Sequence, residues 1–164
     1  MPVNLRPQSG APAADARLYL KEEELDRAVE QLFAAARRFG RGAEPLLAAR
    51  GLGPAHYRAL SAIRRAEGLA VSALREALGV RKQSLARVLD DLDQAGLITR
   101  AAGPKDRRER RLFLTPSGRD VEAEVSAALR ERLAAVFRAC GAEAVAGART
   151  VWAALAETAP EDAP

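Results

Sequence analysis

The residues best suited to chemistry in this sequence are arginines gathered in one short stretch. Residues 100–111 carry six Lys and Arg side chains against two acidic ones. Short apolar runs flank the stretch at residues 97–98 and 112–114, and Gly103 with Pro104 marks a turn between them. The pattern predicts a hairpin with a strongly basic tip. A narrow, A·T-rich minor groove of DNA attracts inserted arginine side chains, so this hairpin is suited to binding a duplex.

A second polar set begins a predicted helix over residues 82–95. The apolar positions of that helix recur at spacings of three and four, which places them on one buried face: Leu85, Val88, Leu89 and Leu92. The exposed positions at its start are Arg81, Lys82, Gln83, Ser84 and Arg87. Glutamine can pair with adenine and arginine or lysine with guanine in the major groove, and a serine at a helix N-terminus can hold a phosphate. We therefore predict that these five residues contact DNA, whereas Asp90, Asp91 and Asp93 repel phosphate and turn the later part of the helix away.

Two shorter elements position this helix. A helix is predicted from Pro54, which suits a first turn, to about residue 67. A further helix begins near residue 71 with Ser72 as its N-cap and ends at the Gly79 turn. Two short helices joined by a glycine turn are typical of a helix–turn–helix, and the basic hairpin after them completes the pattern of a winged helix. Winged helices mostly bind duplex DNA.

Amphipathic helices flank this central block. The apolar spacing predicts helices over residues 19–39, 44–49, 116–140 and 142–157, the last two separated by Gly141. The longer helices each have an apolar face, and one chain offers too few elements to bury all of them. A two-fold dimer would bury these faces and would place two reading helices one DNA turn apart. An intrachain three-helix cap is the alternative.

The composition is that of a mainly helical protein with a basic centre. Among 164 residues the net charge is +4, and residues 50–120 hold 15 Lys and Arg against 8 Asp and Glu. The absence of a long apolar run and of a secretory leader predicts a soluble cytoplasmic protein of bacterial type, with no membrane contact. One cysteine and one histidine exclude a disulfide framework and a metal cluster. No nucleophile–base pair or phosphate loop is present, so we expect neither catalytic residues nor a cofactor, and no enzyme.

The hairpin sequence resembles the wing of one known family. The wing of MarR-family regulators is similar to residues 106–118, which read DRRERRLFLTPSG, and residues 89–98 look like the exit of that family's recognition helix. The resemblance extends from about residue 20 to residue 155. It implies a mainly α fold with a small β-wing, namely a dimeric winged helix–turn–helix with N- and C-terminal dimerisation helices. It also implies that Arg108 enters the minor groove and that Asp106 braces it.

The basic wing offers further side chains to DNA. Lys105, Arg107 and Arg110 join Arg108 as predicted contacts. Within the family, residues 19–25, 53–60 and 82–89 look like the PetP-like branch of alphaproteobacteria. The family's recognition helix commonly reads Ser-Thr-Val-Thr where residues 83–86 read Gln-Ser-Leu-Ala, which implies a distinct operator preference.

Regulation in this family is by small organic ligands or by cysteine oxidation, so the resemblance implies a small-molecule effector as well. The predicted ligand residues are His56, Tyr57, Arg58 and Phe33. His56 has no acidic or metal-binding neighbour in the sequence pattern. Cys140, beside Phe137 at the end of a long helix, is expected to be buried as a small apolar residue and not to act as a reactive thiol.

The predicted organisation has five parts. They are a flexible arm (1–17), N-terminal dimerisation helices (18–50), the winged helix–turn–helix (51–118), C-terminal dimerisation helices (119–158) and a tail (159–164). The predicted function is a homodimeric transcriptional regulator, repressor or activator, that binds a pseudo-palindromic site in double-stranded DNA and in the activating mode contacts RNA polymerase. The alternative is a winged-helix module that binds an acidic protein or RNA without reading DNA sequence.

Overall fold

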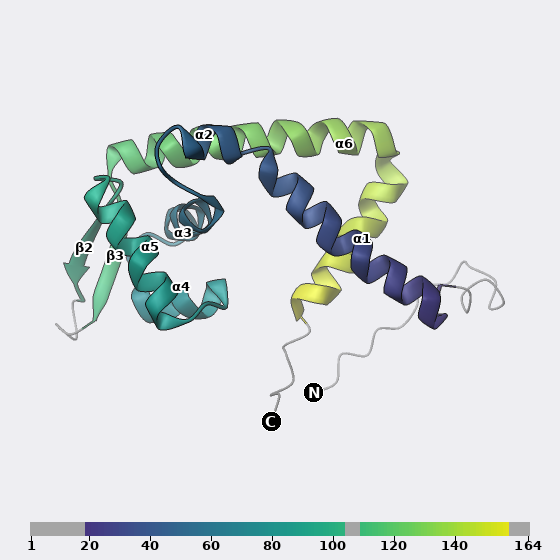
Figure 1. Cartoon of the computed structure of the whole chain (residues 1–164), viewed down its shortest axis with the longest axis horizontal. Coiled ribbons are helices and arrows are strands. Elements are labelled where there is room, and N and C mark those ends of the chain that lie inside the picture. The colour runs from purple at the N-terminus through teal and green to yellow at the C-terminus, as the bar shows by residue number, and fades with distance from the viewer. Residues whose placement is uncertain (1–18, 104–108, 158–164) are drawn as a thin grey trace, which may run out of the picture. The chain divides into compact units, whose positions relative to one another are not determined.

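The computed structural model describes residues 19–103 and 109–157 (Figure 1). The elements follow in the order α1 (Glu22–Arg41), α2 (Glu44–Ala48), α3 (Pro54–Arg65), β1 (Leu69–Ala70), α4 (Val71–Leu78), α5 (Lys82–Gln94), β2 (Ile98–Ala102), β3 (Arg110–Leu114) and α6 (Pro116–Glu157). The chain divides into two units after Phe39. The predicted arm (1–17) and tail (159–164) lie outside the described residues.

Helix α1 makes up most of the described part of the first unit, and none of its residues is buried. Three glutamates in its first turn suit the positive end of the helix dipole: Glu22, Glu23 and Glu24. The helix starts three residues later than predicted and continues through Gly40, where an end was expected, because a glycine inside a helix costs only about 1 kcal/mol. Its apolar side chains lie between 46% and 59% exposed: Leu25, Val29, Leu32 and Phe33. The helix therefore presents an uncovered apolar face.

Helices α3, α4 and α5 pack together around the core of the second unit. The leucine and isoleucine side chains that these helices turn towards the core are buried: Leu60, Ile63, Leu74, Leu85, Leu89 and Leu92. The last three belong to the face of the 82–95 helix that was predicted to be buried. Fully burying one such side chain contributes about 1.5–3 kcal/mol to the free energy of folding. The three helices thus form the predicted helix–turn–helix block, with α3 as the support for α4 and α5.

The sheet is three-stranded and antiparallel, in the order β1-β3-β2. Strands β2 and β3 form the predicted hairpin, with Ile98 opposite Leu114. Strand β1 was not predicted, and it pairs Leu69 with Leu112. The assignment of Ser72 as an N-cap is wrong. Because β1 runs directly into α4, Ala70 is the capping residue, without a side-chain hydrogen bond.

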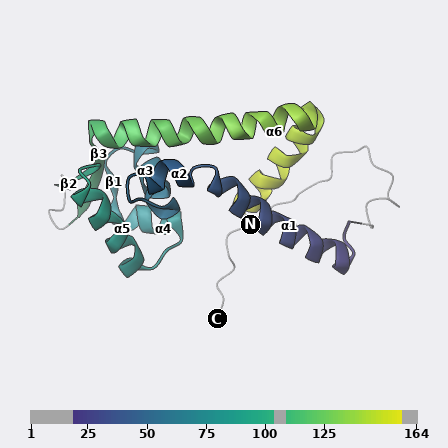
Figure 2. The same cartoon turned by 45° about the horizontal axis from the view of Figure 1, so that its top comes forward.

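Helix α6 is long and broken at the predicted glycine. Gly141 has φ of 80° and ψ of 168°, which interrupts the helical backbone between two helical segments. Across the break, the rings of Phe137 and Trp152 stack with centroids 6.2 Å apart. Figure 1 and Figure 2 both show the winged helix–turn–helix elements along the N-terminal part of α6, whose contacts are with α3 and β3.

A tight corner connects the hairpin to α6. The Thr115 N–H donates to the Leu97 carbonyl at 3.1 Å, and the Thr115 hydroxyl donates to the Gly96 carbonyl at 2.7 Å. The Gly118 N–H in turn donates to the Thr115 hydroxyl oxygen at 3.0 Å. A side chain at Gly118 would overlap the Leu97 carbonyl oxygen, so only glycine fits without movement.

Candidate nucleic-acid interface

The turn between α4 and α5 sets the direction of α5. Gly79 closes α4 in the left-handed conformation with φ of 60°, and its N–H binds the carbonyls of Arg75 and Glu76. Arg81 is extended and precedes α5 as its N-cap, with no side-chain cap. The first amides of α5 are therefore left for water or for an anion such as a phosphate.

The start of α5 is polar and exposed. All five residues predicted to contact DNA are exposed: Arg81, Lys82, Gln83, Ser84 and Arg87. The opposite side of the helix is buried through Leu85 and Leu89. Among the described residues, none of the five makes a side-chain hydrogen bond or ion pair. Their polar groups are available to a ligand, and DNA contact by each of them stays a prediction.

A groove lies between the helix–turn–helix and the hairpin. It is lined by Val71, Ser72, Arg75, Lys82, Leu85, Ala86, Leu89, Arg100, Glu109 and Arg110. The four cationic side chains outnumber the single acidic one, so the groove favours an anion. Arg110, a predicted DNA contact, is exposed at its rim. Arg75 was not predicted to lie at this groove. Its position in the last turn of α4, directly before α5, is the sequence signal that could have indicated it.

The aspartates in the later part of α5 are paired within the protein. Asp90 and Asp93 bind the guanidinium of Arg100 on β2, at 2.6 and 3.2 Å. Asp91 binds His56 on α3 at 3.1 Å between Nε2 and Oδ2. Each carboxylate thus has a partner from another element, which sequence reasoning did not find. The negative charge at the back of α5 is partly neutralised before any ligand binds.

The base of the wing is held by Arg111. Its guanidinium binds Glu109 at 3.1 Å and donates to the Gly68 carbonyl at 3.1 Å, which joins β3 to the loop before β1. Gly103 N–H donates to the Glu109 carbonyl at 3.0 Å. The predicted tip residues lie outside the described residues: Lys105, Asp106, Arg107 and Arg108. Their contacts with DNA, and the bracing by Asp106, stay predictions.

The predicted ligand residues of α3 point to three different elements. His56 accepts a hydrogen bond at Nδ1 from the Gly53 N–H at 2.9 Å, so its proton is on Nε2 and is donated to Asp91. The expectation that His56 lacks an acidic neighbour is therefore wrong. Tyr57 binds Ser126 on α6, and Arg58 donates to the Leu78 carbonyl.

The remaining predicted ligand residue and the cysteine are both exposed. Phe33 is 59% exposed in the other unit. Cys140 is exposed, contrary to the expected burial, because nothing in the described chain covers this face of α6. In the same residues, no three His, Cys, Asp or Glu side chains are grouped to hold a metal ion. The helices described include none that is long and apolar enough to cross a membrane.

Comparison with known proteins identifies the family. The sequence pattern of the MarR family matches residues 50–109. The HTH-type transcriptional regulator PetP of Rhodobacter capsulatus is 42% identical over 151 residues, which make up 92% of this chain and 91% of PetP. The chain belongs to the MarR family. This MarR-family chain is accordingly a winged helix–turn–helix transcriptional regulator, and the predicted mainly α fold with a small β-wing is confirmed. Dimerisation through the N- and C-terminal helices stays a prediction.

Solved structures share the fold at lower identity. A Cys-to-Ser mutant of MarR from E. coli, solved in complex with operator DNA, has a TM-score of 0.65 and 22% identity. The match covers 84% of the MarR-family chain described here and 97% of that protein. NadR, solved in complex with 4-hydroxyphenylacetate, has a TM-score of 0.69 and 21% identity over 94% of this chain and 100% of NadR. At these identities the likeness concerns the fold.

Proposed function

We propose that this MarR-family regulator binds a pseudo-palindromic operator in double-stranded DNA as a homodimer. In this arrangement the start of each α5 enters a major groove, and each wing reaches the neighbouring minor groove. The observation that carries the proposal is the division of charge along α5. Its exposed front is basic and polar without partners among the described residues, whereas the aspartates behind it are bound to Arg100 and His56.

Uncovered apolar side chains support the homodimer. They lie on α1 and on the C-terminal part of α6: Leu25, Val29, Leu32, Phe33, Val136, Val151, Trp152 and Leu155. Burying such a set against a second copy is favourable, because each Å² of apolar surface removed from water contributes about 25 cal/mol. A two-fold dimer then presents two α5 helices to two half-sites.

A small organic effector is a further part of the proposal. The NadR complex supports it by the shared fold. The side chains proposed for contact lie on α3 and are His56, Tyr57 and Arg58, and adding the effector is expected to lower DNA affinity. The regulator acts in the bacterial cytoplasm, and it represses by blocking promoter access unless it contacts RNA polymerase, in which case it activates.

The test is selection of bound duplexes from a random DNA library at about 150 mM salt, where non-specific binding is weak. The expected result is a two-fold-symmetric motif with half-sites about 10 base pairs apart. Affinity for it should fall steeply as salt rises, because phosphate contacts release counterions. Recovery of no motif, or a flat salt profile, would contradict the proposal and favour a protein or RNA partner.

Variants run alongside separate the two parts of the interface. Arg87→Ala on α5 and Arg108→Ala on the wing should each weaken binding to the selected motif. Arg130→Ala is the matched control, since Arg130 is an exposed arginine on α6, outside the proposed interface. Equal losses in all three variants would mean that net charge alone, and not the placed side chains, determines affinity.

A further inference from the structure

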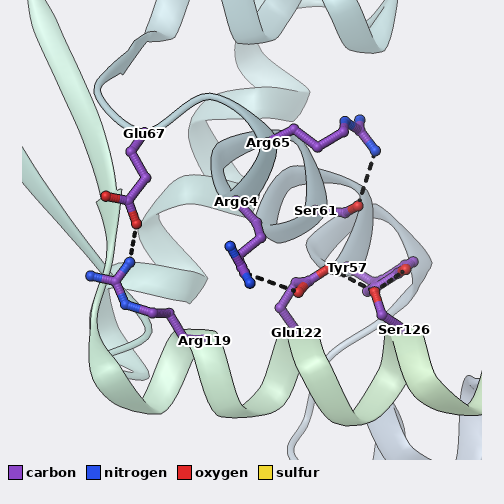
Figure 3. Close-up of polar contacts among 8 residues, drawn as sticks. All are labelled: Tyr57, Ser61, Arg64, Arg65, Glu67, Arg119, Glu122 and Ser126. Carbon is purple, nitrogen blue, oxygen red and sulfur yellow. Dashed lines mark hydrogen bonds and ion pairs between the residues drawn. The ribbon is translucent and has the colours of Figure 1, made fainter.

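A row of polar contacts crosses the junction between α3 and α6 (Figure 3). We call it the polar seam, and it consists of Tyr57–Ser126, Arg64–Glu122 and Glu67–Arg119. We propose that the polar seam fixes the position of the reading head on α6 and thereby the separation of the two α5 helices in the homodimer. Glu122 and Ser126 are then positioning residues for operator binding. This inference rests on the proposed function.

The centre of the polar seam is buried, and both of its polar side chains have partners. Glu122 is 7% exposed and Ser126 is 8% exposed. The Ser126 hydroxyl donates to Glu122 Oε1 at 2.6 Å. Because a serine has a single hydroxyl proton, the contact of 2.9 Å between Tyr57 Oη and Ser126 Oγ is a donation by the tyrosine. Arg64 Nε lies 3.7 Å from Glu122 Oε2 and supplies the opposite charge.

The spacing of the polar seam matches one face of each helix. Arg119, Glu122 and Ser126 follow one another at three and four residues on α6, which places them in one stripe. Tyr57 and Arg64 lie two turns apart on α3. Residue numbers rise on α3 as they fall on α6, so the two helices are paired in antiparallel order. Figure 3 shows the three pairs side by side along α6.

This geometry makes the polar seam selective for one register. The apolar neighbours Val121 and Val125 are buried in the same part of α6, and apolar contact has no preferred direction. A slide of one helix along the other would keep much of that contact. It would separate all three polar pairs together. The buried Glu122 carboxylate would lose the charge of Arg64 and keep only the hydrogen bond from Ser126 on its own helix, which is unfavourable. The polar seam therefore selects among packings that burial alone would tolerate.

The register of α3 on α6 affects the position of α5 on one side and the proposed dimer face on the other. On one side, α3 packs against α4 and α5, so α5 moves with α3. On the other side, α6 continues from Ser126 towards its exposed apolar residues, Val136 among them, which the proposed dimer covers. A change at the polar seam would thus alter how far apart two copies of α5 lie, while each α5 keeps its own structure.

The test compares binding to one half-site with binding to two. The variants are Glu122→Gln combined with Ser126→Ala, and Glu131→Gln as a control on an exposed glutamate of the same helix. The probes are the selected operator duplex, the same duplex with one half-site scrambled, and duplexes with one base pair inserted or removed between half-sites. Thermal unfolding checks each variant, and Ser126→Ala alone replaces the pair where the pair does not fold.

We expect the double variant to lose affinity for one probe and not for the other. Affinity for the scrambled duplex stays as in the wild type, whereas affinity for the intact operator falls about five- to tenfold, the low end of ordinary coupling between sites. The preference for the original spacing over the altered spacings shrinks, and the control behaves as the wild type. Equal losses on intact and scrambled duplexes, or an unchanged spacing preference, overturn the inference while the proposed function stands. Failure of the wild type to select any motif overturns both.

Discussion

The guanidinium of Arg100 and the carboxylate of Asp90 lie 2.6 Å apart and join the wing to the recognition helix. Arg100 also lies 3.2 Å from Asp93, so one cation serves two carboxylates. The contact has two effects. It ties β2 to α5, and it lowers the negative potential that incoming DNA phosphates would meet.

Replacing Arg100 is expected to affect DNA binding more than folding. Arg100→Gln leaves Asp90 and Asp93 without their cation close to the proposed DNA face, so operator affinity should fall. The free energy of unfolding should change by only about 0–1 kcal/mol, because these pairs are partly exposed. Fluorescence anisotropy with labelled operator and urea unfolding measure the two quantities.

A second set of variants separates repulsion from loss of a direct contact. Adding Asp90→Asn and Asp93→Asn to Arg100→Gln should restore much of the affinity if repulsion is the cause. Arg100→Lys keeps the charge and should lie between the wild type and Arg100→Gln. No recovery in the triple variant would mean that Arg100 itself touches DNA.

Gln83 is expected to read a base. Gln83→Ala should cost about 1–3 kcal/mol of binding free energy at one base-pair position and little at the others, since a glutamine that pairs with adenine discriminates there. Binding to a panel of single-base operator variants measures this. Gln94→Ala, at the other end of the same helix, is the matched control and should leave the profile unchanged. A uniform loss over the whole panel would reassign Gln83 to the DNA backbone.

Two glycines of α6 are expected to respond in opposite directions to alanine. Gly118→Ala should lower the free energy of unfolding by about 1–3 kcal/mol, because its methyl group meets the backbone of Leu97. Gly147→Ala should raise it by about 0.5–1 kcal/mol, since the position is open and alanine favours a helix. Urea unfolding measures both. A neutral Gly118→Ala would mean that the corner relaxes easily.

The exposed valine at position 151 is expected to matter for assembly. Val151→Asp places a charge on the apolar face that the proposed dimer buries, so dimers should dissociate or the protein should become insoluble. Size-exclusion chromatography with light scattering, over a range of protein concentrations, follows this. Val151→Ala should keep the dimer with a smaller loss of affinity between copies. A stable Val151→Asp dimer would place the interface elsewhere.

Local patterns predicted much of the fold. The spacing of Leu85, Leu89 and Leu92 predicts a helix over residues 82–95, and α5 spans Lys82–Gln94. The break in α6 at Gly141 was predicted from the glycine itself, because residues other than glycine rarely adopt the backbone conformation found there. Both features depend on neighbouring residues alone, and the pattern of neighbouring residues is what a single sequence displays most directly.

Contacts between residues that lie far apart in the chain could not be predicted from the sequence. Strand β1 has two residues, too few for a pattern, and it forms because β3 lies beside it. His56 and Asp91 are 35 residues apart, and nothing near either one indicates the pairing. Glutamate and serine are usually exposed on helices, and the burial of Glu122 and Ser126 depends on where α3 packs. The expected burial of Cys140 assumed a covering element that the described chain does not supply.

The continuity of α6 between Ser126 and Gly141 has a consequence for changes in chain length. One residue inserted there would rotate everything after it by about 100° around the helix axis relative to everything before it. The buried face that α3 requires and the apolar face near the C-terminus would then no longer be in phase. Insertions and deletions in this stretch are therefore expected only as whole helical turns, as in a seven-residue step.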